Sequence, residues 1–279
     1  MIKKVLVALD PDSDTAVATR YAADVARRFN ATVTGLAVVD LGSIESGTKG
    51  GGIGSFYYAE KLRDQLTSET RARARELVKR YKKAVEGSGV EHVEVVEEGV
   101  PFQRIVEDMK YHDLLVIGKD PHFFYGHPKK ETNTLARVVK NTVAPTLVVG
   151  DAYADINRIL IAYDGSNPSA RAVKQFVQLM PFGDEVKVNV VTIYEKESTE
   201  AELMLRLVRE FLEAHGITPE TVALKGDNPA DLLVEYSSYV GAALVVAGAH
   251  SVSGIRKIAF GSTMSALTGK CPVPLFLDS

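Results

Sequence analysis

Only one cysteine, Cys271, occurs among the 279 residues, so the chain cannot form an internal disulfide and gives no sign of secretion. No motif of a reactive thiol surrounds Cys271, and we expect it to be a small core residue. Apolar runs are short as well. None is long enough to span a bilayer, and the run after the two N-terminal lysines is ended by Asp10 before it reaches the length of a signal peptide. These absences predict a cytoplasmic protein without a membrane partner.

Excess charge and catalytic motifs are missing too. The 33 basic and 36 acidic side chains give a net charge of −3, which does not suit binding to a nucleic-acid backbone. The sequence has no Walker motif, no zinc signature and no serine nucleophile elbow. His122 and His127 lie near Asp120, but their spacing fits no zinc motif. We therefore expect no catalytic residues and no metal site.

One order of elements occurs twice along the chain. In the first half, short apolar runs that predict buried strands alternate with helical periodicities, and the first of these runs ends in Asp10. The expected strands are 5–9, 33–39, 93–96, 114–117 and 146–149, and the expected helices are 18–29, 72–85, 105–109 and 135–139.

The same order starts again at Asn157, and Asp164 follows its first strand as Asp10 follows the first strand of the chain. The expected segments are strands at 159–163, 187–193, 243–247 and 273–277 and a long helix at 203–212. Strands that are apolar throughout and alternate with helices indicate parallel sheets covered on both faces. We therefore predict two α/β domains, residues 1–150 and 156–279.

The first half is longer than the second by roughly 26 residues, judged from the repeat offset. This insertion, residues 41–66, contains six glycines followed by Phe56-Tyr57-Tyr58. It lacks the lysine of a P-loop and the glycine spacing of a dinucleotide site. We expect a flexible flap, which could act as a lid if the aromatic residues dock on the neighbouring domain.

A loop between two glycines in the second half fits an anion. Gly248 directly follows the expected strand 243–247, and Gly261 precedes Ser262 and Thr263, where a helical periodicity begins. Glycine allows close approach of backbone N–H groups, and the first N–H groups of a helix have no partner within the helix. The loop therefore predicts a phosphate site, although a glycine turn with a serine N-cap explains the same residues.

Asp164 belongs to the same predicted site. In an open parallel sheet, ligands bind beyond the carboxyl ends of the strands, where the strand order reverses. If the first and fourth strands of the second half are neighbours there, Asp164 and the Gly248 loop line one crevice. An ionised aspartate only accepts hydrogen bonds, so it can receive them from a ribose hydroxyl or an adenine amino group. A turn and helix N-cap at 164–166 is compatible with that role.

Taken together, three features resemble the tandem universal stress proteins: the duplicated unit, the strand ending in Tyr163-Asp-Gly-Ser166, and the glycine loop followed by a Val-Pro strand. The resemblance covers the chain apart from residues 41–66. It implies two Rossmann-like domains with five parallel strands each, and ATP or AMP, with or without Mg²⁺, as the ligand. It also implies pairing between the domains and a homodimer.

The resemblance assigns the nucleotide to residues at strand ends and in the glycine loop. These residues are Asp164, Val191, Thr192, Gly248, His250, Ser251, Gly261, Ser262 and Thr263. The aspartate would contact the adenosine, the main chain at 191–192 would flank the base, and the loop would hold the phosphates. Ser251 stands where the family has its second glycine, so positive-φ freedom is lost there.

The first half departs further from the family pattern. Asp120 and Pro121 follow Gly118, and Thr132-Asn133 replaces the Gly-Ser pair. Asp120 would repel a phosphate, and Pro121 has no N–H to donate. We expect that the first domain binds no triphosphate in this manner and is structural or serves another ligand.

The sequence therefore predicts a nucleotide-binding regulatory or protective module of the stress response, with the nucleotide in the second domain, rather than a dedicated enzyme. Two alternatives stay open. One is an interaction scaffold whose glycine loop is vestigial, as the serine at position 251 would suggest. The other is a slow ATP-hydrolysing or adenylate-transferring enzyme, for which the sequence shows no general base near the phosphates.

Overall fold

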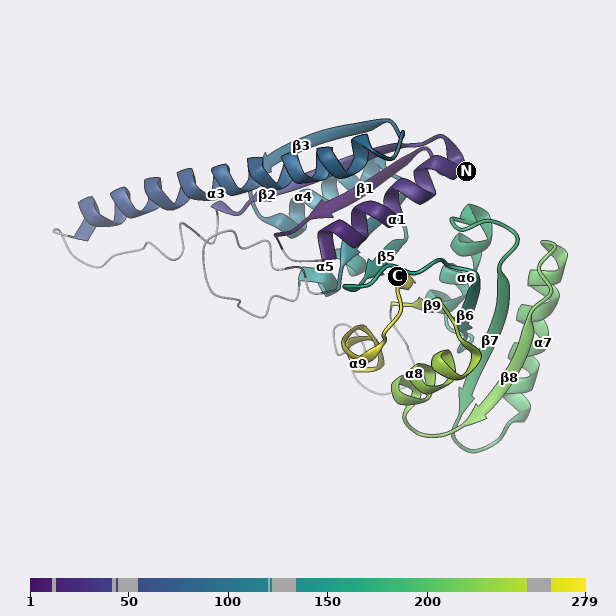
Figure 1. Cartoon of the computed structure of the whole chain (residues 1–279). Coiled ribbons are helices and arrows are strands. Elements are labelled where there is room, and N and C mark those ends of the chain that lie inside the picture. The colour runs from purple at the N-terminus through teal and green to yellow at the C-terminus, as the bar shows by residue number, and fades with distance from the viewer. Residues whose placement is uncertain (12–13, 42–43, 45–54, 120, 122–133, 250–261) are drawn as a thin grey trace. The chain divides into compact units, whose positions relative to one another are not determined.

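The computed structural model describes residues 1–11, 14–41, 44, 55–119, 121, 134–249 and 262–279. The chain divides into an N-terminal unit, Lys3–Val138, and a C-terminal unit, Val139–Ser279 together with Met1–Ile2. Each unit has helices packed on a mostly parallel sheet, which confirms the predicted fold class (Figure 1).

In the N-terminal unit, the part of the chain that the structure describes has four parallel strands in the order β3-β2-β1-β4. The elements up to α5 are β1 (Lys4–Leu9), α1 (Asp14–Phe29), β2 (Thr32–Val39), α3 (Ser55–Glu86), β3 (His92–Glu98), α4 (Pro101–Asp108), η1 (Met109–Tyr111), β4 (Leu114–Gly118) and α5 (Thr134–Asn141). Strands β1, β2 and β4 are almost wholly buried, as their continuous apolar sequences require, whereas the edge strand β3 is half exposed. Helices α1 and α3 lie on one face and α4 on the other (Figure 1).

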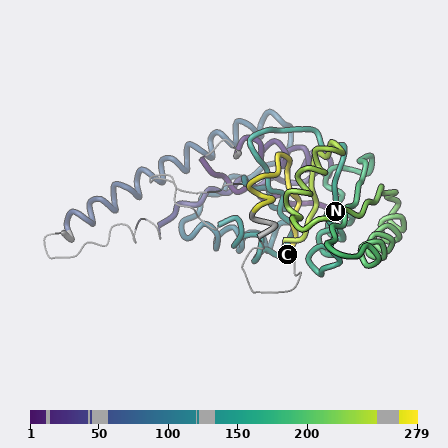
Figure 2. The backbone as a smooth tube through the Cα atoms, turned by 90° about the horizontal axis from the view of Figure 1, so that it is seen from below, coloured from purple at the N-terminus to yellow at the C-terminus, as the bar shows by residue number. Residues whose placement is uncertain are grey.

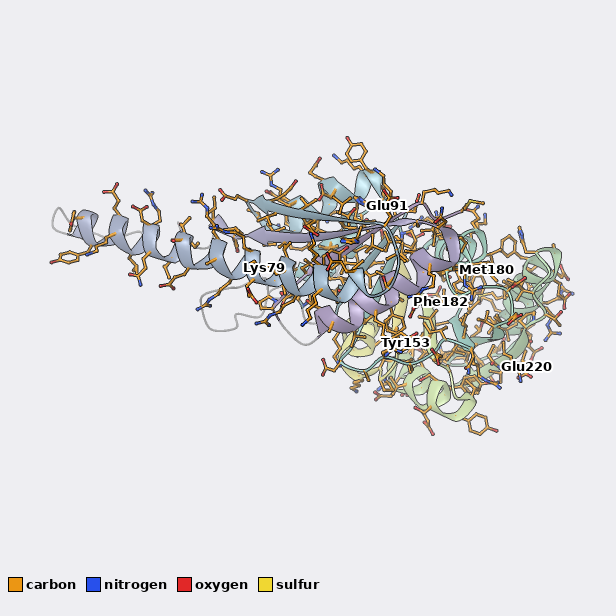
Figure 3. The ribbon with its side chains drawn as sticks, turned by 45° about the horizontal axis from the view of Figure 1, so that its top comes forward. Lys79, Glu91, Tyr153, Met180, Phe182 and Glu220 are labelled. Atoms are coloured by element: carbon orange, nitrogen blue, oxygen red, sulfur yellow. The ribbon has the colours of Figure 1, made fainter. Side chains whose placement is uncertain are left out.

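The expected helix at 72–85 was wrong at its start, because α3 begins at Ser55. Among its described side chains, the buried ones begin at the middle of the helix, at Thr70, Ala74, Leu77, Tyr81 and Val85, with the three- and four-residue spacing of an amphipathic helix. The residues from 57 to 69 are exposed or partly exposed, and these turns project past the strands of their unit (Figures 2 and 3). Residues 55–66 of the predicted flap are therefore helical, while its glycines lie outside the described residues.

Close packing of α3 on the sheet depends on a glycine. The Tyr81 hydroxyl donates a hydrogen bond to the Val33 carbonyl oxygen at 2.9 Å, and its ring lies flat against Gly35. A Cβ at Gly35 would be 2.5 Å from Cε1 of that ring, so no larger residue fits here without moving Tyr81.

The described residues of the C-terminal unit form six strands in the order β5-β10-β9-β6-β7-β8. Its elements are β5 (Thr146–Val149), β6 (Arg158–Ala162), α6 (Asn167–Leu179), β7 (Lys187–Tyr194), α7 (Thr199–Ala214), β8 (Glu220–Lys225), α8 (Pro229–Val240), β9 (Leu244–Gly248), α9 (Ser262–Lys270) and β10 (Leu275–Asp278). All neighbours are parallel except β5 and β10, which pair antiparallel with Phe276 opposite Leu147.

The chain runs from β6 outward to β7 and β8, and then returns to place β9 on the other side of β6. The order of strands thus reverses between β6 and β9, and this is the switch point that the sequence predicted. Helix α8 packs against α9 within this unit (Figure 1).

One strand of the C-terminal unit was missing from the sequence prediction. Strand β8 was not among the expected segments, because its residues are only partly buried and its apolar pattern is short. Strand β5 was predicted to complete the first half; in the division of the chain given above it is grouped with the C-terminal unit, in which it pairs with β10. The expected boundary near residue 150 stays a prediction about which segment folds on its own.

Within the described part of the chain, no helix combines the length and the apolar character that crossing a bilayer requires.

Candidate functional site

A cavity of 420 Å³ opens at the carboxyl ends of β6, β7 and β9 in the C-terminal unit. Its floor is apolar, with Val191, Ala247, Leu233 and Leu267 all buried. The residues lining it are Ala162, Tyr163, Asp164, Gly165, Ser166, Ser169, Val191, Thr192, Ile193, Glu195, Met204, Gly226, Pro229, Leu233, Ala247, Gly248 and Leu267. Four residues predicted from the sequence, Asp164, Val191, Thr192 and Gly248, therefore lie around one cavity.

Asp164 begins the turn that leads from β6 into α6. Its Oδ1 accepts a hydrogen bond from the Ser166 N–H at 3.0 Å, and Gly165 between them has φ +72°, which glycine adopts without strain. Ser166 is the N-cap of α6, and its hydroxyl accepts from the Ser169 N–H at 3.3 Å. The turn and cap considered from the sequence are thus confirmed. The Asp164 side chain is exposed at the mouth of the cavity.

Thr192 fixes the lip of the cavity on the β7 side. Its buried hydroxyl donates to the Tyr163 carbonyl oxygen at 2.8 Å, just beyond the end of β6. The Tyr163 N–H in turn donates to the Val191 carbonyl oxygen at 2.9 Å. These two bonds extend the connection between β6 and β7 by one residue, so the side chain of Thr192 holds the wall instead of pointing at a ligand.

Ile193 carries main-chain groups that face the cavity edge. Backbone groups alternate in direction along a strand, and those of Val191 point toward β6 while Tyr194 accepts from Gly226 on the β8 side. The N–H and C=O of Ile193 therefore point to the same side as those of Val191, where β6 has already ended. Within the described residues, neither group of Ile193 has a hydrogen-bond partner. A donor and an acceptor thus lie side by side at the lip.

The packing of β9 against α6 requires a glycine at position 248, which the sequence did not reveal. A Cβ at this position would lie 2.4 Å from the Ser169 nitrogen and 2.6 Å from the Pro168 carbonyl carbon. Both are backbone atoms in the first turn of α6, so they cannot rotate away as a side chain would. Glycine here allows β9 to approach α6, and it leaves this end of the cavity open.

The other predicted loop residues are only partly covered by the structure. Helix α9 starts at Ser262, so Ser262 and Thr263 form its first turn, as the sequence predicted. His250, Ser251 and Gly261 lie outside the described residues, as do His122 and His127 of the N-terminal unit.

Some cavity residues were missed from the sequence because they come from distant elements. Met204 comes from α7, Glu195 follows β7, and Leu233 comes from α8. The Met204 sulfur covers Gly165: a Cβ at Gly165 would lie 2.5 Å from it. The periodicity of a helical sequence predicts which side chains are buried, but it does not predict which strands those side chains pack against.

The equivalent position in the N-terminal unit is built differently. Asp10 is only 4% exposed, and its N–H donates to the Thr15 hydroxyl at 2.8 Å. The same hydroxyl is hydrogen-bonded to the Asp10 carbonyl oxygen. The two halves of the repeat therefore present a buried and an exposed aspartate at corresponding strand ends.

The chemistry available at the cavity is recognition by hydrogen bonds. Burial and the neighbouring Asp164 carboxylate raise the pKa of the Tyr163 hydroxyl, so this phenol stays neutral at physiological pH. Among the described residues, no group of three or more His, Cys, Asp or Glu side chains is arranged to hold a metal ion. The cavity thus combines an apolar floor, an exposed carboxylate and main-chain groups that have no partner in the part of the chain described.

Comparison with known proteins agrees with this architecture. Residues 1–150 and 155–277 each match the Universal stress protein family. The chain is 25% identical over 288 residues to universal stress protein Slr1230 from Synechocystis, covering 98% of this chain and 99% of the relative. It is 30% identical over 153 residues to universal stress protein MJ0531 from Methanocaldococcus jannaschii, covering 53% of this chain and 82% of that protein.

Solved structures share the fold over the whole length. A universal stress protein from Archaeoglobus fulgidus superposes with a TM-score of 0.69 at 17% identity, covering 99% of this chain and 96% of that chain. One from Pseudomonas aeruginosa superposes with a TM-score of 0.63 at 14% identity, covering 99% and 93%. The chain therefore belongs to the universal stress protein family, as a member with two tandem domains.

Proposed function

We propose that the C-terminal cavity binds ATP or AMP and that the protein is a nucleotide-binding regulatory or protective module. The observation that carries this proposal is the position of the 420 Å³ cavity, which lies at the switch point and is lined by four of the residues predicted for the nucleotide. Its volume falls in the range of about 300–1,000 Å³ common for small-molecule sites.

The lip of the cavity suits adenine. The unpaired N–H and C=O of Ile193 form a neighbouring donor and acceptor. Adenine offers the complementary pair, the N1 acceptor and the N6 amino donor, whereas guanine has the opposite order, an N1–H donor and the O6 acceptor. The apolar floor of Val191, Ala247 and Leu233 would cover the faces of the base. We therefore expect adenine nucleotides to bind in preference to guanine nucleotides.

The mouth of the cavity suits the sugar and phosphates. Asp164 can accept hydrogen bonds from ribose hydroxyls, because its carboxylate is exposed beside the cavity. At the other end, Gly248 leaves the backbone open, and the first turn of α9 at Ser262 offers N–H groups that a helix leaves unpaired. In this proposal His250, Ser251, Gly261 and Thr263 complete the phosphate site, and Mg²⁺ would enter only with the nucleotide.

Calorimetric titration of the whole protein with ATP, AMP, adenosine and GTP tests the proposal. We expect saturable binding of the three adenine compounds and binding of GTP weaker by roughly tenfold or more, since reversing a donor and an acceptor costs at least one hydrogen bond. Asp164→Ala should weaken ATP binding by roughly tenfold. Asp184→Ala, which removes an exposed aspartate from the loop before β7, should leave it unchanged.

Other results would select among the alternatives. Failure to bind any adenine compound, together with purified protein that releases no nucleotide on denaturation, would reject the proposal in favour of an interaction scaffold. Release of ADP or AMP at catalytic protein concentrations would instead indicate a slow ATP-hydrolysing or adenylate-transferring enzyme.

The cytoplasmic location, the pairing of domains 1–150 and 156–279 and the homodimer are further parts of the proposal. Cell fractionation tests the first. Light scattering coupled to size-exclusion chromatography tests the homodimer, because a dimer has twice the 30.3 kDa of the chain.

A further inference from the structure

Met204 occupies an unusual place in the wall of the cavity. It reaches from α7 to the turn after β6, where its Sδ would be 2.5 Å from a Cβ on Gly165, next to Asp164. Met204 also lines a second, open groove of 1130 Å³ along β7 and α7. Thr192, Ile193, Glu195 and Met204 border both spaces. One flexible, apolar side chain thus helps to separate the candidate site from the open groove.

Met204 is partly exposed to solvent and lines the open groove. Its side chain is partly exposed, whereas Ala201, Leu205, Val208 and Leu212, which attach α7 to the sheet, are buried. A chemical change at Met204 would therefore alter the cavity wall without removing the contacts that hold the helix. This separates it from Met109, which is fully buried in the N-terminal unit.

We propose that Met204 is an oxidation site through which a peroxide weakens ligand binding in the adjoining cavity. In the reaction, the sulfur lone pair attacks one oxygen of hydrogen peroxide, the S–O bond forms as the O–O bond breaks, and the departing hydroxide takes up the remaining proton to leave water. The sulfur loses two electrons and the peroxide gains them. The product is methionine sulfoxide.

The sulfoxide does not fit the place of the thioether. The sulfur rests against Gly165 with no space for a further atom on that side, and the new oxygen is a strong hydrogen-bond acceptor. Asp164 next to it is another acceptor, so the two groups offer each other no hydrogen bond. The oxidised side chain turns toward solvent or displaces the turn at 164–166, and in either case the wall of the cavity is lost.

The inference rests on the proposed nucleotide site, so the test measures oxidation and binding separately. The whole protein is treated with hydrogen peroxide, oxygen addition is located by peptide mass spectrometry, and ATP binding is titrated before and after. We expect Met204 to be oxidised well before Met109, ATP binding to weaken by roughly tenfold, and bound ATP to slow oxidation of Met204, since the coupling is reciprocal. Far-UV circular dichroism checks that the fold is retained.

Substitutions identify the residue responsible. Met204→Leu should have the same ATP affinity before and after peroxide treatment, because leucine does not oxidise. Met180→Leu is the matched control: Met180 is also partly exposed, follows the last residue of α6 and is not among the described residues that line the cavity, so its replacement should leave peroxide sensitivity intact. Met204→Gln, which places a polar group in the wall, should weaken binding without peroxide.

Three results would overturn the inference. Met204 oxidised no faster than Met109 would show that the sulfur is not accessible. Oxidation of Met204 with unchanged ATP affinity would show that the wall does not matter, and would leave the proposed nucleotide site standing. Absence of ATP binding before any peroxide is added would reject the proposed function and the inference with it.

Discussion

The hydroxyl of Thr192 donates a hydrogen bond of 2.8 Å to the carbonyl oxygen of Tyr163, one residue beyond the end of β6. This bond replaces the next rung of the ladder between β6 and β7. It leaves the main-chain groups of Ile193 without a partner among the described residues. The edge that we assign to the base is therefore maintained by a side chain that need not touch the ligand.

Thr192→Val should destabilise the C-terminal unit. The substitution keeps the shape of the side chain but leaves the Tyr163 carbonyl oxygen without its donor, at a cost of about 1–2 kcal/mol in the free energy of unfolding. Urea denaturation measures the change. Thr199→Val, at the exposed start of α7, should have almost no effect. Equal stability of the Thr192 variant and the wild type would contradict this role.

Gly248→Ala should be more damaging than an ordinary glycine substitution. The added Cβ meets backbone atoms of Pro168 and Ser169, so β9 and the start of α6 must move apart. We expect a loss of about 1–3 kcal/mol, seen as a lower midpoint of thermal unfolding, and weaker ATP binding. Gly269→Ala is the control, since open space surrounds Gly269 in α9 and alanine favours a helix. Unchanged thermal stability of the Gly248 variant would disprove the close contact.

Gly35→Ala should affect the N-terminal unit alone. Its Cβ would push the buried ring of Tyr81 and break the hydrogen bond from the tyrosine hydroxyl to Val33, for a loss of about 1–3 kcal/mol. Chemical denaturation should report the loss, while ATP titration of the folded variant should match the wild type. Gly87→Ala, where the added carbon meets no atom, should be neutral. Weakened ATP binding by the Gly35 variant would show that the nucleotide site depends on the N-terminal unit.

The ion pair of Arg71 with Glu98 predicts a pH dependence. Two hydrogen bonds, of 2.6 and 3.1 Å, from the guanidinium hold the pKa of the Glu98 carboxyl below its usual range. Because the folded pKa is lowered, the stabilisation is present above the pKa of the unfolded chain and is lost as the pH falls through the folded pKa. Both side chains are exposed, so salt should weaken the effect.

NMR titration of the carboxyl groups checks this dependence. Arg71→Gln should raise the pKa of Glu98. It should leave Glu97 unchanged, because the pKa of that carboxyl is raised by burial and by Asp108. A Glu98 pKa that does not respond to the substitution would mean that the pair does not persist in solution.

The sequence was sufficient for the repeat, the fold class and the turn at Asp164, because each depends on local signals such as apolar runs and capping residues. The sequence was misleading for the start of α3. The first turns of this helix bury few side chains and have no clear apolar face, so the glycines before them led to the prediction of a flap. The roles of Ile193 and Met204 depend on where β6 stops and on what α7 covers. Such facts belong to packing between distant segments, which no local pattern encodes.

The antiparallel pairing of β5 with β10 affects how a fragment of the C-terminal half behaves when it is produced on its own. A fragment that begins at residue 156 lacks β5, so the backbone N–H and C=O groups along one side of Leu275–Asp278 lose their partners. An uncovered apolar strand edge can pair with the same edge of a second fragment. We therefore expect the fragment that begins at residue 156 to self-associate through β10. A fragment that begins at Val139 carries β5 with it and keeps that edge covered.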